Sequence, residues 1–195
     1  MTHTRVRLSP DDRREQLLDL GIELLATRSL DELSIDLLAE EAGISRGLLY
    51  HYFGGKQGFH EAVVQHAADE LYARTAPPDE GEPLERLLAS ITGYVDYVVA
   101  NQPGYRSLVK AASGSNPALR EIYETTFRAL ADRFFTTDTG TYDLPDTPAV
   151  RLLVHAWQAT MWAKPFAHGI DAPASRPATW TARARRPSCA ACRIE

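Results

Sequence analysis

The chain has 195 residues, of which 44% are hydrophobic, and its formal net charge is −5. This length and composition exclude disorder throughout and allow one large core or two small ones. No stretch approaches the roughly 18 apolar residues that a membrane-spanning helix needs, and the first residues lack an apolar signal core. The two cysteines, Cys189 and Cys192, are too close together to organise a disulfide framework. We therefore expect a cytoplasmic globular protein with no membrane partner.

Apolar residues recur at helical spacing almost throughout, whereas strict alternation over the length of a strand is rare. The pattern predicts an all-α protein. A serine–proline pair at 9–10, followed by two aspartates, marks the start of a first helix that we expect to end near Arg28. Ser34 and Ser45 are placed to cap two short helices, which Gly43 separates.

Pairs of a capping residue and a proline recur further along the chain, and helices are predicted over about 56–75, 83–101, 103–112, 117–136 and 148–167. A Pro/Gly/acid linker at 76–82 and a loop at 137–146 separate some of them. The last segment, 171–195, holds seven Ala, five Arg and three Pro without a sustained apolar stripe. Such a composition indicates a tail, which is either a native extension or the product of a reading-frame shift.

The stretch GISRGLLYHYFGGK, residues 43–56, places aromatic and basic side chains close together. If Gly43 is the turn of a helix-turn-helix, the small Ala39 lets the two helices cross closely, and Leu49 and Tyr52 return to the inner face. Glycine suits the turn because it reaches a positive φ without steric cost. The whole pattern is more specific than any residue in it, and it predicts a helix-turn-helix.

The second helix of such a pair enters the major groove with its N-terminal residues nearest the base edges. Arg46 can pair bidentately with guanine or contact a phosphate, and Gly47 lets the backbone approach closely. Leu48 is placed to touch a thymine methyl group. Lys56 adds a positive charge at the start of the next helix, where free backbone amides also favour an anion.

Three further side chains are candidates for phosphate contact. Tyr50 offers a hydroxyl, His51 offers ring nitrogens, and Ser34 lies at the flank together with the N-terminal arginines. Each has a plainer alternative: Tyr50 can be a half-buried aromatic, and His51 a surface histidine. The arm that carries Arg5 and Arg7 is either a solvated segment or a minor-groove contact.

The segment from Arg13 to Val64 resembles the DNA-binding domain of the tetracycline-repressor (TetR) family of bacterial transcription regulators. The resemblance is carried above all by AGISRGLLYHYFGGK. It implies that operator DNA is faced by Ser34, Arg46, Gly47, Leu48, Tyr50, His51 and Lys56. It also implies a helix-turn-helix DNA-binding domain at 1–55 and a helical ligand-binding and dimerisation domain at 56–170, before the atypical tail at 171–195.

Aromatic and polar side chains lie among apolar ones from Pro83 onward, and we expect most of them in the core. A helical body of this composition can also line a pocket for a small, largely apolar effector. The candidate lining residues are Tyr94, Tyr97, Phe127, His155 and Trp162.

No cofactor and no metal site is expected. His60 and His66 have the wrong spacing for a zinc helix, and Cys189 with Cys192 is half of a zinc site or two free thiols. Neither histidine has a partnered nucleophile at an informative spacing, so we predict that the chain is not an enzyme.

These features predict a homodimeric DNA-binding transcriptional regulator, a repressor released from a palindromic operator by its effector. Two alternatives remain: a helical small-molecule-binding protein without regulatory DNA binding, and a small helical enzyme, which would need a histidine beside a Ser, Cys or carboxylate. Chains of the resembled family usually finish with an apolar helix, where this chain has its tail. A dimer without that helix would depend mainly on 149–166.

Overall fold

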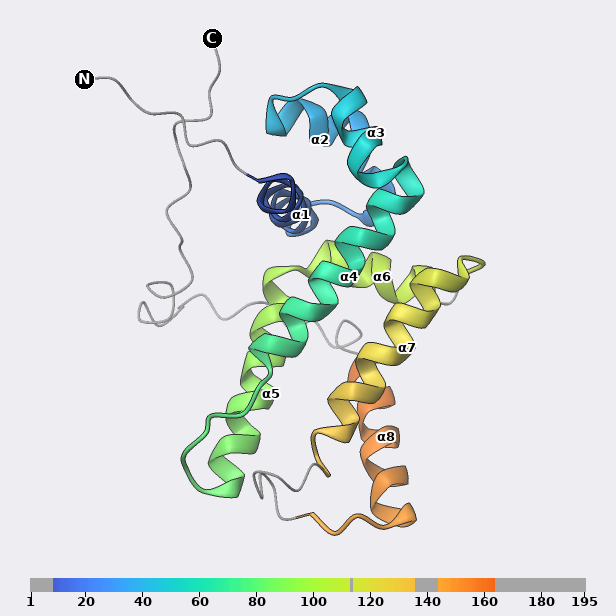
Figure 1. The fold of residues 1–195 in the computed structure, drawn as a ribbon. Coiled ribbons are helices and arrows are strands. Elements are labelled where there is room, and N and C mark those ends of the chain that lie inside the picture. The colour runs from blue at the N-terminus through green and yellow to red at the C-terminus, as the bar shows by residue number, and fades with distance from the viewer. Residues whose placement is uncertain (1–8, 113, 136–143, 164–195) are drawn as a thin grey trace, which may run out of the picture.

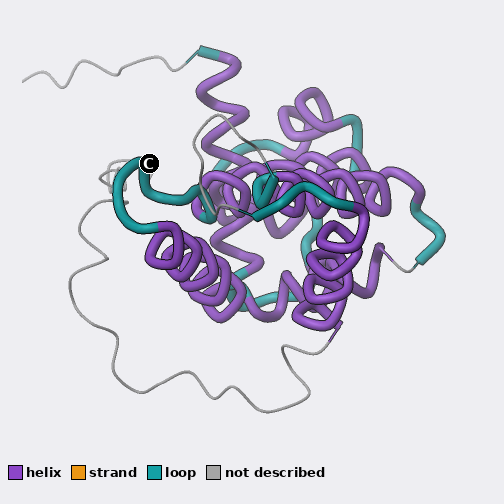
Figure 2. The backbone as a smooth tube through the Cα atoms, turned by 90° about the horizontal axis from the view of Figure 1, so that it is seen from below, coloured by secondary structure: helices purple, strands orange, loops and turns teal. Residues whose placement is uncertain are grey.

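The computed structural model describes residues 9–112, 114–135 and 144–163, and within the last range it describes the side chains only up to Trp157. Every regular element in these ranges is helical, as Figure 2 shows. The elements in chain order are α1 (Pro10–Leu25), the 3₁₀ turn η1 (Leu30–Glu32), α2 (Ile35–Ala42), α3 (Arg46–Phe53), α4 (Lys56–Arg74), α5 (Pro83–Ala100), α6 (Gln102–Ala112), α7 (Pro117–Asp132) and α8 (Pro148–Ala163). The all-α prediction is confirmed for this part of the chain.

Three of the predicted helix caps are formed by serines of the first 50 residues. The Ser9 hydroxyl accepts a hydrogen bond from the Asp12 amide at 3.1 Å, and the Asp12 carboxylate accepts one from the Ser9 amide, which completes a capping box. Ser34 and Ser45 accept from the third amide of α2 and α3 at 3.1 and 3.3 Å. These short helices therefore begin where the local sequence places them.

The first helix is shorter than the sequence predicted. α1 ends at Leu25 instead of near Arg28, and the chain turns into η1. Ser29 begins a new capping box here, because its amide donates to the Glu32 carboxylate at 2.7 Å. Similarly, α7 ends at Asp132, a few residues earlier than expected. The predicted loop at 137–146 and helix end at 164–167 lie largely outside the described residues, and the tail at 171–195 lies wholly outside them.

Helices α1 to α3 form the upper part of the molecule in Figure 1, and we call them the reading head. α4 runs from the head down to the lower helices, α5 to α8, which we call the body. The core of the head is nearly closed to solvent: Leu17 of α1, Leu38 of α2 and Leu49 of α3 are at most 1% exposed. Phe59 of α4 and Leu119 of α7 belong to the same cluster, so the head packs directly on the body.

The body has its own apolar cluster, rich in aromatic side chains. It is formed by Leu71, Tyr94, Tyr97, Val98, Tyr105, Phe127 and Leu130. A smaller cluster, in which Val154 of α8 meets Phe135 and Ala131, holds α8 against the end of α7. None of the described helices is both long and apolar enough to cross a membrane.

Candidate nucleic-acid interface and cavity

The turn between α2 and α3 has the predicted conformation. Gly43 adopts φ +62° and ψ +36°, and the following amide, of Ile44, donates to the Ala39 carbonyl at 3.1 Å. A Cβ at Gly43 would have no neighbour within 4 Å, so the positive φ and not crowding is what selects glycine here. Ala39 and Leu49 are buried on the inner side, as predicted, and Tyr52 packs against them half-buried.

The opposite side of α3 presents the predicted contact residues to solvent. Arg46, Gly47 and His51 are exposed, Tyr50 is 54% exposed, and Leu48 is half-buried. No atom lies within 4 Å of the place where a Cβ of Gly47 would stand, so the backbone is open to a close approach there. The structure thus brings these five residues together on one outer surface, which we call the α3 surface.

Arg46 makes a contact that the sequence analysis missed. Its Nε lies 2.6 Å from Oδ1 of Asp36, which is in the first turn of α2, and both side chains are about two-thirds exposed. A guanidinium carries five N–H donors, so Arg46 keeps donors for a base or a phosphate beside this contact. Asp36 is ten residues from Arg46 in the sequence, and only the crossing of α2 and α3 makes them neighbours.

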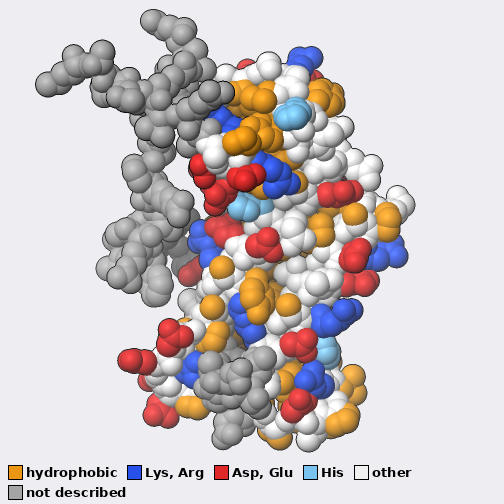
Figure 3. Space-filling view, viewed as in Figure 1, with side chains coloured by type: hydrophobic (Ala, Val, Ile, Leu, Met, Phe, Trp, Pro, Cys, Tyr) orange, Lys and Arg blue, Asp and Glu red, His pale blue; other side chains and the backbone are white. Residues whose placement is uncertain are grey.

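The two remaining candidates lie beside the α3 surface, and each already has a partner within the chain. Lys56 is exposed, and its Nζ donates to the carbonyl oxygen of Asp31 at 3.0 Å. Ser34 accepts a hydrogen bond as the cap of α2, which leaves its hydroxyl proton for a second partner. Figure 3 shows Lys and Arg side chains interspersed with Asp and Glu over the visible face. The positive charge near α3 is therefore not part of a large basic surface on this face.

α4 connects the head to the body through two histidines that the sequence analysis weighed only as metal ligands or catalytic residues. Nε2 of His60 donates to the Leu33 carbonyl oxygen at 2.7 Å, and burial lowers the pKa of His60 below its ordinary value. Further along α4, Nε2 of His66 lies 2.8 Å from a carboxylate oxygen of Asp19 in α1. The spacing of four between Lys56 and His60 indicates a shared helix face, but their carbonyl partners cannot be read from sequence.

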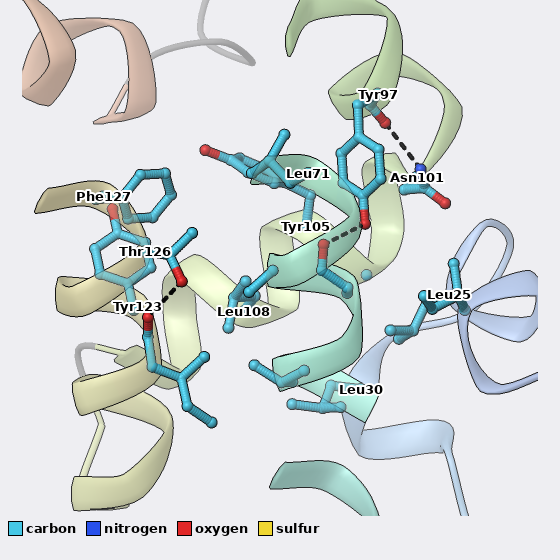
Figure 4. A pocket seen from close by; sticks show the side chains of 16 residues that line it. Leu25, Leu30, Leu71, Tyr97, Asn101, Tyr105, Leu108, Tyr123, Thr126 and Phe127 are labelled. Atoms are coloured by element: carbon cyan, nitrogen blue, oxygen red, sulfur yellow. Dashed lines mark hydrogen bonds between the residues drawn. The ribbon is translucent and has the colours of Figure 1, made fainter. Parts of the chain in front are cut away.

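A small cavity of about 40 Å³ lies where the head meets the body. Figure 4 shows its walls: Leu25 and Leu30 come from α1 and η1, and Tyr97, Tyr105 and Phe127 from three helices of the body. The predicted lining residues Tyr97 and Phe127 thus share one cavity.

Of the other three predicted lining residues, two lie outside the cavity wall, and the side chain of the third is not among those described. Tyr94 is buried one layer behind it, where its hydroxyl lies 2.7 Å from that of Tyr105. His155 is exposed on α8 and is not part of the cavity wall. The side chain of Trp162 lies outside the described residues.

The cavity is lined by uncharged side chains. Its polar groups are hydroxyls and one amide, that of Asn101, which donates to the Tyr97 carbonyl at 3.0 Å. The Tyr97 hydroxyl donates to the carbonyl of Ala67 at 3.0 Å. Burial raises the pKa of Tyr97 and of Tyr105 well above the ordinary value, so both stay neutral at any physiological pH. Within the described ranges, no three His, Cys, Asp or Glu side chains gather as a metal site would require.

A three-helix head that carries an exposed helix-turn-helix on an all-helical body defines the class of this protein: a helix-turn-helix transcriptional regulator. The family described as "Bacterial regulatory proteins, tetR family" matches residues 17–63. A TetR-family transcriptional regulator from Streptomyces coelicolor, a solved structure, is 32% identical with a TM-score of 0.70, over 80% of this chain and 69% of that one. The chain belongs to the TetR family of bacterial regulatory proteins, whose members act as regulators and not as enzymes.

Curated relatives carry names of the same kind. The HTH-type transcriptional activator FasR of Mycolicibacterium smegmatis is 28% identical over 131 residues, which are 66% of this chain and 60% of the relative. The HTH-type transcriptional regulator BetI of Ectopseudomonas mendocina is 33% identical over 116 residues, 56% of this chain and 59% of the relative. The matches thus span about three-fifths of the length of these two relatives.

Proposed function

We propose that this chain is a cytoplasmic, homodimeric repressor that binds a palindromic operator and leaves it when a small, largely apolar molecule binds the body. The observation that carries the proposal is the α3 surface, where a guanidinium, an open backbone position and a phenol stand exposed beside Lys56. These exposed groups add nothing to the packing of α3, whereas a helix in the major groove uses each of them to contact bases or phosphates. Release from DNA amounts to induction wherever the operator overlaps a promoter.

Dimerisation is supported by α8. Leu152 and Leu153 are 69% and 67% exposed on this helix, and Trp157 is 41% exposed. Large apolar side chains gathered on one exposed helix indicate a contact with another molecule. A second copy related by a two-fold axis would place two reading heads on the two half-sites of a palindrome.

The three parts of the chain then have separate roles in the proposal. Residues 1–55, with Lys56 at the start of α4, bind the operator through Ser34 and the α3 surface. Residues 56–170 bind the effector and the second copy, and the tail at 171–195 adds only non-specific attraction to DNA through its arginines. Tyr97 and Phe127 are the effector contacts that the cavity supports.

Gel-shift titration tests the proposal directly. The DNA is an inverted repeat from the intergenic region beside the gene, and a shuffled duplex of the same composition is the control. We expect operator affinity to exceed that for the shuffled duplex by at least about a thousandfold and to fall steeply with salt. Equal binding to the two duplexes, or none, would favour the alternative of a helical small-molecule-binding protein without regulatory DNA binding.

A further inference from the structure

The segment that leads into α2 is held to α4 by two side chains. Leu33 lies directly after η1, and Ser34 follows it as the cap of α2. Lys56 and His60, one turn apart in α4, donate to the carbonyl oxygens of Asp31 and Leu33 at 3.0 and 2.7 Å. Among the described residues, no backbone amide donates to either oxygen. The two side chains of α4 therefore satisfy carbonyls that this turn leaves unpaired.

The two contacts differ in how easily they can be given up. The Lys56 contact is exposed, so water can take its place at Asp31 when the ammonium turns to a phosphate. The contact between His60 and Leu33 is partly buried, and a buried carbonyl without a donor is unfavourable. Burial also holds the pKa of His60 below its ordinary value, so at pH 7.5 the ring is neutral and its single N–H is on Nε2.

The His60 contact fixes the peptide group that leads into Ser34. The Leu33 carbonyl and the Ser34 amide belong to one planar peptide group, so holding the carbonyl sets the plane of both. On its other side Ser34 is fixed by α2, because its hydroxyl accepts from the Leu37 amide at 3.1 Å and its carbonyl from the Leu38 amide at 3.0 Å. The orientation of Ser34 is thus determined from α4 as well as from α2.

We propose that His60 is a positioning residue for operator binding, which acts through the Leu33 carbonyl to hold Ser34 where its hydroxyl proton reaches a phosphate. The inference rests on the proposed function, in which Ser34 contacts DNA beside the α3 surface. Without the Nε2–H donor, the Leu33–Ser34 peptide group also takes other orientations. Only the fraction of molecules with the native orientation makes the phosphate contact, so the apparent affinity falls with that fraction.

Two substitutions separate the N–H donor from the bulk of the ring. His60→Leu keeps an apolar side chain without a donor, whereas His60→Gln keeps an N–H donor on a flexible stem. Operator affinity is measured by fluorescence anisotropy at a temperature where both variants are folded. We expect it to fall about tenfold in His60→Leu and by less than about threefold in His60→Gln. The slope of log affinity against log salt should not change, because no Lys or Arg is removed.

His66→Leu is the matched control. His66 lies on the same helix and also contacts the head, but through the Asp19 side chain of α1. This variant should keep its operator affinity within about threefold, since a purely structural loss lowers the melting temperature and not the affinity of the folded protein. Equal losses in His60→Leu and His66→Leu, or in His60→Leu and His60→Gln, would overturn the role of His60. An unchanged affinity in His60→Leu would do the same.

A double-mutant cycle tests whether His60 acts through Ser34. In a Ser34→Ala background the hydroxyl is absent, so His60→Leu should cost less than about threefold in operator affinity. The full tenfold loss in that background would contradict the proposal. If the unsubstituted protein shows no preference for the operator, the proposed function itself fails, whereas these patterns of loss concern His60 alone.

The unsubstituted protein provides a test that also serves if His60→Leu does not fold. In the protein with isotope-labelled histidine, the NMR shifts of the ring nitrogens show which nitrogen carries the proton. We expect His60 to have its proton on Nε2 at pH 7.5, both free and with the operator bound, because the Leu33 carbonyl accepts from that nitrogen throughout. A proton on Nδ1 alone, or a change of protonation when the operator binds, would overturn the proposal.

Discussion

Arg46 does not stand alone on the α3 surface, because Asp36 holds its Nε at 2.6 Å. A carboxylate so near the DNA has two consequences. It restrains the guanidinium, so that less side-chain freedom is lost when Arg46 pairs with a base, and it repels phosphates, so that DNA without the right base is bound less well. Asp36 therefore acts on the ratio of operator to random-sequence affinity.

Substitutions at the two positions should have different effects. Asp36→Asn should raise the affinity for random-sequence DNA severalfold, and so lower the ratio of operator affinity to random-sequence affinity. Arg46→Ala should lose roughly 1–3 kcal/mol on the operator and little on random DNA, if Arg46 reads a base. Fluorescence anisotropy at fixed salt measures both. Glu40→Gln removes a charge from another exposed position of α2 and is the control; the same effect from it and from Asp36→Asn would assign the change to overall charge alone.

Lys56 contributes charge, and its effect should not depend on sequence. In the free protein its Nζ donates to the Asp31 carbonyl. A lysine ammonium has three donors, so Lys56 can also donate to a phosphate oxygen. Lys56→Ala should weaken binding to all DNA and lower the slope of log affinity against log salt by about one. Lys110→Ala, at an exposed position of α6, should leave the slope unchanged. An unaltered slope in Lys56→Ala would remove Lys56 from the interface.

At the scale of elements, α4 is the connection through which the body can act on the head. Lys56 donates to the carbonyl of Asp31 in η1, His60 donates to the carbonyl of Leu33 directly after η1, and His66 contacts α1. These polar contacts fix the orientation of α4 relative to the head. They also predict that the stability of this junction depends on pH through His60.

Burial lowers the pKa of folded His60 below the ordinary value of about 6.5, and Lys56 contributes in the same direction, whereas the Leu33 carbonyl opposes it. The unfolded chain therefore binds this proton first as the pH falls below about 6.5, and the free energy of unfolding falls with it until the folded pKa is passed. His60→Gln should show a smaller drop in melting temperature between pH 7 and pH 5 than the unsubstituted protein. Identical drops would mean that His60 is not buried as described.

The short-range features of the fold were predictable from sequence, and the long-range ones were not. The Ser34 and Ser45 caps and the Gly43 turn depend on neighbours within about five residues, and the helix-turn-helix follows from them. The contact between Asp36 and Arg46 depends on the crossing of two helices. The Ser29–Glu32 capping box was visible as a local motif but was overlooked, and it accounts for the early end of α1.

The lining of the candidate cavity, too, could be predicted from sequence only in part. Tyr97 and Phe127 were predicted from apolar surroundings alone, and both line it. His155 has similar surroundings in the sequence but is exposed, because the part of α8 whose side chains are described packs its Val154 side against the end of α7. The contribution of Leu25 and Leu30 could not be foreseen, since it requires packing between segments about 70 to 100 residues apart.

At the scale of the whole molecule, the proposed dimer depends on α8. Arg151 anchors this helix to α7 through the Asp132 carboxylate at 3.0 Å, and Val154 is buried there, which leaves Leu152 and Leu153 facing outward. Burying a leucine side chain contributes about 1.5–3 kcal/mol, and a two-fold axis would make each contact twice. The question that follows is whether this helix suffices without the segment at 171–195.

Truncation after residue 170, with and without Leu153→Asp, answers it. The tail is rich in Ala, Arg and Pro and has few large apolar groups to offset an ordering entropy of about 1–2 kcal/mol per residue, so its removal should cost little stability. We expect the full chain and the truncated chain to sediment as dimers with similar melting temperatures, and Leu153→Asp to make both monomeric. Truncation should lower binding to random DNA more than to the operator, because it removes Arg183, Arg185 and Arg186. If the truncated chain is monomeric while the full chain is a dimer, residues 171–195 supply part of the interface, and the assignment of 56–170 as the complete dimerisation domain is wrong.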